Sequence, residues 1–245
     1  MNHPFLICQT SDYDALRKRA SQSPYKDFVD EARNVVSSLT YEPEQSVAAR
    51  GTHIRDLTGS SALLYILEPD NRDAHRKRIT DILDQWPQFT TDVAARWDAG
   101  GNRWHATVPI SSGFFNTVLA LDVIHDDLPE SDLQRYEQSL AEMTEWFWAK
   151  MRGWAMATYG PRAIWAAYKS EDRLEEAMQQ YRDGVFEQMT RHGVGRNGPE
   201  YSHARLNGER TAKYGFMHVG EYTGLDNSFY RDFRLKWYYE WLFSA

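Results

Sequence analysis

Apolar residues recur along this chain at steps of three and four, which is the spacing of one face of an α-helix. The two clearest stripes are Leu133, Tyr136, Leu140, Met143 and Phe147, and Leu174, Met178, Tyr181, Val185 and Gln188 or Met189. Strand-like alternation is rare, and Thr107 to Pro109 is the one short candidate. The pattern therefore predicts an all-α protein.

The predicted helices come in pairs that are joined by short breaks rich in Pro, Asp and Gly. The pairs are 45–67 with 71–86, 111–125 with 130–150, 155–168 with 171–191, and 209–223 with 227–243. Repeated antiparallel hairpins of this length predict an (α/α) array, either a toroid or a solenoid. Four hairpins would make an incomplete toroid. Two irregular stretches, Ala99 to Ser112 and Gly193 to Gly208, are expected as loops that carry function.

Size and charge narrow the classes of protein to consider. A chain of 245 residues fits one toroid-type domain over 1–245, and its helical last residues are compatible with its being the N-terminal part of a longer protein. The net charge of −7 argues against a nucleic-acid partner. No run of about 18 apolar residues predicts a membrane span, and no signal peptide is visible. Cys8 stands alone, so neither an intrachain disulfide nor a thiol metal site is expected.

Groups that carry protons and groups that bind anions are crowded into one segment, residues 192–222. It contains three His, three Tyr and three Arg within one stretch. A segment that only filled a core would be apolar, and one that only faced solvent would not need histidines among its tyrosines. The mixture indicates an enzyme whose substrate is a charged sugar.

Three stretches carry a family resemblance. They are HPFL at 3–6 with the short predicted helix after it, FFN at 114–116 in the pair that runs to 130, and 193–215 with NGPEY at 197–201, His203 and Tyr214-Gly215. The first resembles the start of the α/α toroid in heparinase II/III-like and alginate-lyase-like polysaccharide lyases. The second is similar to their helix pair with an active-site Asn, and the third to the loop and helix that carry their catalytic His and Tyr.

The resemblance implies β-elimination at C4 of a uronic acid, and the reaction sets three tasks. The carboxylate must be neutralised, a base must remove the C5 proton, and an acid must protonate the leaving oxygen. Asn, His or Arg donors can stabilise the enolate-like intermediate, so no metal and no organic cofactor is expected. Motifs for nucleotide binding, zinc proteases and serine hydrolases are absent from the sequence.

The tasks are assigned to particular residues by the resemblance. Tyr214 and Tyr201 are the acid and base candidates, His203 is a second base or a carboxylate ligand, and Asn116 neutralises the carboxylate. A phenol with a pKa of about 10 needs nearby positive charge to act as a base, and Arg205 and Arg210 lie in the same segment. The further substrate-binding candidates are Arg205, Arg210, Asn197, Glu200, Trp104, His105 and His218. The alternative for each is ordinary packing or solvated surface.

Three functions stay open from the sequence. The first is a lyase whose partner is an acidic polysaccharide, which implies an extracytoplasmic location because large polymers do not enter cells. The second is a glycoside hydrolase on the same fold, which needs two facing carboxyl groups from Asp98, Asp122, Glu200 or Glu209. The third is a non-catalytic helical array that binds a carbohydrate or protein partner.

Overall fold

The computed structural model describes residues 2–100, 104–150, 155–170, 173–187 and 222–224. Every regular element in this part of the chain is helical, so the predicted all-α class is confirmed. The α-helices are α1 (Tyr13–Ala20), α2 (Tyr25–Ser38), α3 (Val47–Leu67), α4 (Arg72–Leu83), α5 (Trp86–Asp98), α6 (Trp104–Ile124), α7 (Glu130–Lys150), α8 (Ala155–Lys169) and α9 (Leu174–Glu187). Short 3-10 turns are η1 (Thr10–Asp12), η2 (Pro69–Asn71) and η3 (His125–Asp127).

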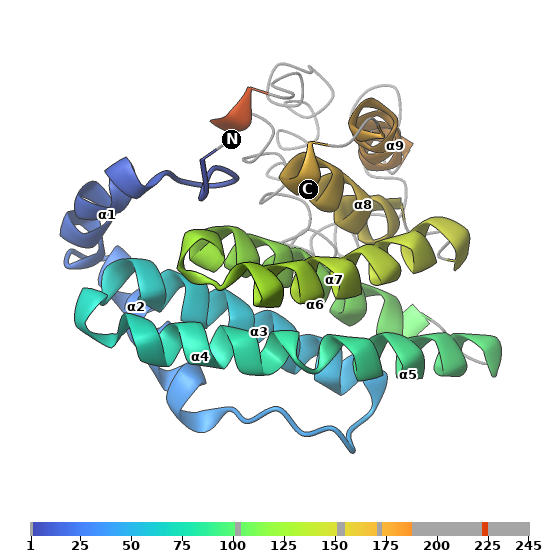
Figure 1. The fold of residues 1–245 in the computed structure, drawn as a ribbon, viewed down its shortest axis with the longest axis horizontal. Coiled ribbons are helices and arrows are strands. Elements are labelled where there is room, and N and C mark those ends of the chain that lie inside the picture. Colours follow the sequence, from blue (N-terminus) through green and yellow to red (C-terminus); the bar gives the residue numbers. More distant parts are fainter. Residues whose placement is uncertain (1, 101–103, 151–154, 171–172, 188–221, 225–245) are drawn as a thin grey trace, which may run out of the picture.

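Three helical hairpins follow one another along the chain and match three of the predicted pairs (Figure 1). The first joins α3 to α4 through η2, the second joins α6 to α7 through η3, and the third joins α8 to α9. Pro69 begins η2, and Pro129 directly precedes α7, which fits a residue that cannot donate a backbone hydrogen bond. The fourth predicted pair lies outside the described residues, apart from 222–224.

The first helices of neighbouring hairpins run in the same direction. Gly51 near the start of α3 lies against Pro109 of α6. At the other end, the Tyr65 hydroxyl donates a hydrogen bond to the carboxylate of Asp127, directly after α6. Contacts therefore advance together along both helices, which makes α3 and α6 parallel.

The second helices repeat this arrangement in a neighbouring row. Arg135 of α7 donates to Asp84, at the end of α4, over 2.6 Å. Lys150 at the end of α7 lies 3.8 Å from Asp98 at the end of α5. The row α4–α5 and helix α7 thus also run in parallel, so whole hairpins are stacked on one another.

The contact between α3 and α6 depends on glycine. A Cβ atom on Gly51 would lie 2.8 Å from the carbonyl carbon of Pro109, and one on Gly113 would lie 2.7 Å from the carbonyl oxygen of Gly51. Because these neighbours are backbone atoms, they cannot rotate away as a side chain can. The two helices therefore approach backbone to backbone near the start of α3.

The same contact explains where the prediction for residues 99–112 was wrong. This stretch was expected to be irregular, with Thr107 to Pro109 as its strand candidate, yet α6 already begins at Trp104 and includes Pro109. A proline inside a helix removes one hydrogen bond and costs about 3 kcal/mol. Packing against Gly51 and burial of the apolar residues that follow offset this cost. Tertiary contact therefore overrode the local signal of the proline.

Helix α5 covers residues 86–98 and follows α4 in the same row. The predicted pairs included only Trp86 of these residues. The predicted helix 71–86 ends instead at Leu83, and Pro87 begins the next helix in its first turn, a position that proline favours. Trp86 and Phe89 are fully buried, and Trp86 meets Phe114 of α6 edge to face with ring centroids 5.6 Å apart. Helix α5 therefore packs its buried aromatic side chains against α6 and forms part of the core.

One apolar core runs from the N-terminal residues to α9, and it includes Phe5, Phe114, Phe147 and Met178. Burial of each phenylalanine contributes about 1.5–3 kcal/mol. By length and composition, one described helix, Thr107–Asp127, is apolar enough to cross a membrane, but 78% of its span is buried by the surrounding hairpins. Core packing is thus an adequate explanation of its hydrophobicity.

Candidate functional site at the carboxyl end of the first helices

The first helices α3, α6 and α8 finish at one end of the array, which we call the carboxyl end. Tyr65 of α3 bonds to Asp127 after α6. The ring of His125, also after α6, lies 6.4 Å from that of Tyr168, near the end of α8. Three helices thus present their last turns to one place.

The N-terminal segment, residues 2–12, crosses the carboxyl end and is fastened to it by Asp122. One carboxylate oxygen of Asp122 accepts hydrogen bonds from the backbone N–H groups of Phe5 at 3.1 Å and Leu6 at 3.0 Å. The other lies 2.7 Å from Nδ1 of His3. Asp122 is completely buried, so these donors replace the water that its charge would otherwise require.

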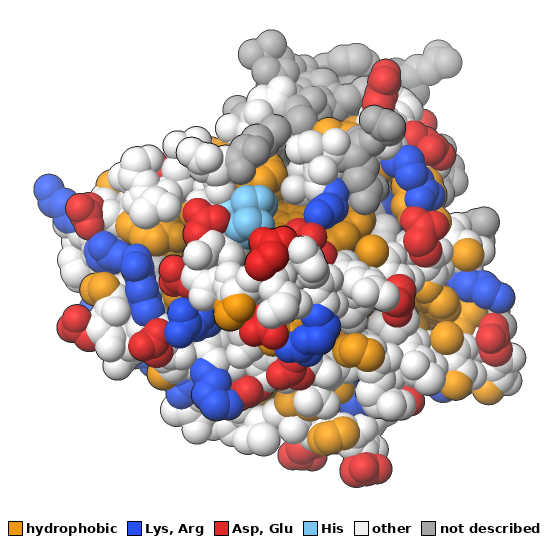
Figure 2. Space-filling view, viewed as in Figure 1, with side chains coloured by type: hydrophobic (Ala, Val, Ile, Leu, Met, Phe, Trp, Pro, Cys, Tyr) orange, Lys and Arg blue, Asp and Glu red, His pale blue; other side chains and the backbone are white. Residues whose placement is uncertain are grey.

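Two histidines stack at this end. The rings of His3 and His125 are nearly parallel at 13°, with centroids 3.6 Å apart. Nδ1 of His125 lies 2.8 Å from Oδ1 of Asp126. Each imidazole therefore has its own carboxylate, one buried and one exposed. Figure 2 shows histidine near the middle of this face, next to acidic and apolar side chains.

Two tyrosines, Tyr65 and Tyr168, lie near the stacked rings of His3 and His125, and both stay protonated at neutral pH. Burial, followed by the charge of Glu137 and a 3.0 Å hydrogen bond to it, raises the pKa of Tyr168 far above its usual range. Burial and the bond to Asp127 raise the pKa of Tyr65 in the same way. A phenol in such surroundings donates a hydrogen bond and does not accept a proton at neutral pH.

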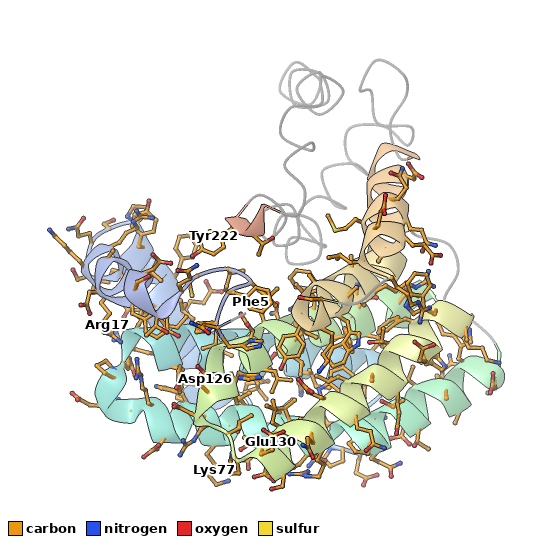
Figure 3. The ribbon with its side chains drawn as sticks, turned by 45° about the horizontal axis from the view of Figure 1, so that its top comes forward. Phe5, Arg17, Lys77, Asp126, Glu130 and Tyr222 are labelled. Carbon is orange, nitrogen blue, oxygen red and sulfur yellow. The ribbon has the colours of Figure 1, made fainter. Side chains whose placement is uncertain are left out.

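The end of segment 192–222 returns to the same place. The hydroxyl of Tyr222 donates a 2.7 Å hydrogen bond to the carboxylate of Asp12, the last residue of η1. Desolvation, together with this bond, raises the pKa of Tyr222 to about 12. The backbone N–H of Gln9 and the Tyr222 hydroxyl lower the pKa of Asp12. Figure 3 shows Tyr222, Phe5 and Asp126 at this one end of the molecule.

A cavity of about 440 Å³ opens beside the N-terminal segment. Its described lining is Asn2, His3, Pro4, Phe5, Gln9, Thr10 and Ser11. This volume falls within the range of small-molecule sites, about 300–1,000 Å³. The lining combines apolar surface with hydroxyl, amide and imidazole groups, which is suited to a polar ligand with flat faces.

No group of three His, Cys, Asp or Glu side chains in the part of the chain that the structure describes could hold a metal ion. Cys8 belongs to the N-terminal segment and is buried there, and this burial, followed by the charges of Asp122 and Asp12, raises its pKa to about 12. The thiol is therefore protonated and unreactive at neutral pH.

Most of the predicted site residues lie outside the described residues. They are Tyr214, Tyr201, His203, Arg205, Arg210, Asn197, Glu200 and His218. Their roles stay predictions. The described residue of their segment, Tyr222, is bonded at the carboxyl end.

Asn116 is described, and it lies between α3 and α6. Its Nδ2 donates a 2.9 Å hydrogen bond to the carbonyl of Arg55, and it faces Gly59 closely. Asp122 follows six residues later, about 9 Å along the helix. One N–H of Asn116 thus serves the contact between helices, and its role with a substrate carboxylate stays a prediction.

The sequence predicted that Trp104 and His105 lie in a loop. In the structure they are instead the first two residues of α6. They stand at the opposite end of this helix of 21 residues from the His3 cluster, about 30 Å away along its axis. These two substrate-binding candidates are therefore remote from the carboxyl end.

His3, His125 and Tyr168 are site residues that the sequence did not single out. His3 was noticed only as part of HPFL, and Asp122 only as a carboxyl group for a hydrolase. Asp122 is the lone charge in the apolar run TVLALDVI, and HDD follows directly at 125–127. A single charge in a buried helix face has to be paired, and that signal could have identified this end.

No family model, curated protein or solved structure matches this chain. The resemblance to polysaccharide lyases thus rests on the residues of the three stretches themselves.

Proposed function

We propose that this protein is a polysaccharide lyase that cleaves a uronic-acid-containing polymer by β-elimination. Its substrates would be alginate- or glucuronan-like chains or glycosaminoglycans, and its hairpins would belong to an (α/α) toroid, complete or incomplete. The observation that carries the proposal is the bond between Tyr222 and Asp12. It places Tyr222, the last residue of the segment richest in acid, base and anion-binding groups, at the end where three helices and the N-terminal segment meet.

The roles follow from the tasks of the reaction. Tyr214 or Tyr201 serves as acid and base, with His203 as a second base. An anionic substrate requires positive charge, and the described carboxyl end is rich in carboxylates. Arg205 and Arg210 therefore supply the carboxylate-binding charge in this proposal, because a guanidinium binds a carboxylate with two parallel hydrogen bonds.

The described carboxylates do not favour the glycoside hydrolase. Asp122 is fully buried and bonded to the N-terminal segment. Asp98 ends α5, beside Lys150 at the far end of the array. Two carboxyl groups across a sugar must be within about 10 Å of one another, whereas these stand at opposite ends of the 21-residue α6.

The test is incubation of the protein with alginate, glucuronan, hyaluronan and heparin. A lyase produces an unsaturated uronate whose ultraviolet absorbance rises on at least one polymer. New reducing ends without that absorbance would indicate a hydrolase instead, and no change on any polymer would contradict the proposal.

A pair of variants tests the acid–base assignment. Tyr214→Phe is expected to lower kcat by about 10²- to 10⁴-fold, which is the usual contribution of one acid–base group. Tyr25→Phe is the matched control, since it removes an exposed hydroxyl from α2, outside the candidate site. Its kcat should stay within about threefold of the wild type. Normal turnover by Tyr214→Phe would transfer the role to Tyr201.

A further inference from the structure

The bond between His3 and Asp122 determines which ring nitrogen of His3 is engaged with the protein and which can contact a ligand. A carboxylate only accepts hydrogen bonds, so Nδ1, 2.7 Å away, carries a proton. Among the described residues Nδ1 is the ring nitrogen with a hydrogen-bond partner, which leaves Nε2 for the cavity that His3 lines. Stacking on His125 holds the ring in this plane. His3 is therefore oriented before any ligand arrives.

The cavity beside His3 has the two kinds of surface that a pyranose ring needs. Pro4 and Phe5 contribute apolar atoms for a sugar face, and Gln9, Thr10 and Ser11 contribute amide and hydroxyl groups for its hydroxyls. The volume of about 440 Å³ accommodates a small polar ligand.

Charge at this place does not exclude an anion. The carboxylate of Asp122 is offset by three donors and is completely buried. Asp126 is paired with His125, and Asp12 accepts bonds from Tyr222 and from the amide of Gln9.

We infer that this cavity is a subsite for one uronate unit of an acidic polysaccharide, with His3 binding its carboxylate through Nε2 and Asp122 acting as the positioning residue. This inference rests on the proposed function and extends it to residues of the N-terminal segment. The bond formed is N–H···O, from Nε2 of His3 to the sugar carboxylate, and no covalent change takes place at this subsite.

Two substitutions at position 3 separate anchoring from binding. In His3→Asn, the amide nitrogen takes the place of Nδ1 and keeps the bond to Asp122, while the nitrogen that faces the cavity is lost. In His3→Gln, the longer amide takes the place of Nε2 and loses the anchor. A structural role predicts damage mainly in His3→Gln, and the subsite predicts it mainly in His3→Asn.

The binding experiment uses D-glucuronate, which has no linkage to cleave, and D-glucose as the neutral control. We expect glucuronate, but not glucose, to shift the side-chain ¹⁵N resonance of His3 Nε2 saturably, and His3→Asn to weaken glucuronate binding at least about fivefold. On the polymer that is cleaved, the same variant should raise KM by about five- to tenfold and change kcat less than about twofold. Asp122→Asn should give a smaller rise in KM with the same pattern.

The outcomes distinguish the two proposals. Binding of glucuronate at His3 without cleavage of any polymer would keep the subsite and remove the lyase. Cleavage with an unchanged KM in His3→Asn would keep the lyase and overturn the subsite. Equal shifts of the His3 Nε2 resonance with glucose and glucuronate would contradict the proposal that His3 binds the carboxylate of the sugar.

Discussion

The two ends of the parallel pair α3 and α6 are built in opposite ways. At the glycine end, defined by Gly51, Gly113 and Pro109, the helices touch backbone to backbone. At the carboxyl end they are bridged by the side chains of Tyr65 and Asp127, while Asp122 binds a third piece of chain. The glycine end fixes how the hairpins stack, and the carboxyl end gathers polar groups from distant segments.

The difference shows where this fold can carry chemistry. Close backbone packing at Gly51 and Gly113 leaves no space between the two helices even for an added Cβ atom. A buried carboxylate with several donors costs desolvation energy but orients the groups that it binds. The carboxyl end is therefore the better candidate for function, and substitutions at both ends can test this contrast.

The largest effect is expected from Asp122→Ala. The change leaves two backbone N–H groups and His3 without their buried acceptor, and breaking a buried charged pair costs about 3–5 kcal/mol. The measurement is the free energy of unfolding in urea. Asp126→Ala is the control, because its exposed bond to His125 should contribute less than about 1 kcal/mol. Equal losses in the two variants would show that the N-terminal segment is not anchored by Asp122.

An intermediate effect is expected from Gly51→Ala at the glycine end. The added Cβ would lie 2.8 Å from the carbonyl carbon of Pro109, and overpacking of this kind costs about 1–3 kcal/mol, although alanine favours a helix by about 1 kcal/mol over glycine. Gly59→Ala is the matched control, because its Cβ would meet only the side chain of Asn116. The free energy of unfolding should therefore be lower for Gly51→Ala than for Gly59→Ala. The reverse order would contradict the close contact of α3 with α6.

The smallest effect concerns Cys8, a buried residue of the N-terminal segment. Its pKa rises from an ordinary 9.0 to about 12, so the folded protein keeps the proton while the unfolded chain loses it. The contribution of this thiol to stability is therefore full below pH 9 and falls as pH rises from about 9 towards 12, at about 1.4 kcal/mol per pH unit. Between pH 9 and 10 the wild type should lose about 1 kcal/mol more than Cys8→Ala. Identical pH profiles would mean that the carboxyl end is open to solvent.

Much of the fold was predictable because the helices follow from the local spacing of apolar residues. The predicted helices 45–67 and 130–150 correspond closely to α3 (Val47–Leu67) and α7 (Glu130–Lys150), since apolar residues three and four apart define a buried face wherever that face packs. Pro109 was misread because its local meaning is a break, whereas its surroundings in α6 are set by Gly51, far away in the sequence.

The site was less predictable, for a reason of distance along the chain. His3 and Asp122 are 119 residues apart, and no spacing rule relates them. The segment with Tyr201, His203 and Tyr214 was found by composition, and its roles stay predictions. Tyr222 is bonded to Asp12, a residue that composition did not identify.

By itself, the sequence determined the helical class, the three described hairpins and the presence of one segment crowded with proton carriers, because each depends on neighbours within a few turns. The tertiary structure alone decided that Pro109 continues a helix, that glycines bring α3 and α6 together, and that Asp122 holds the N-terminal segment against His125. Those features depend on burial, which raises the cost of an unpaired charge and rewards close packing only after distant segments have met.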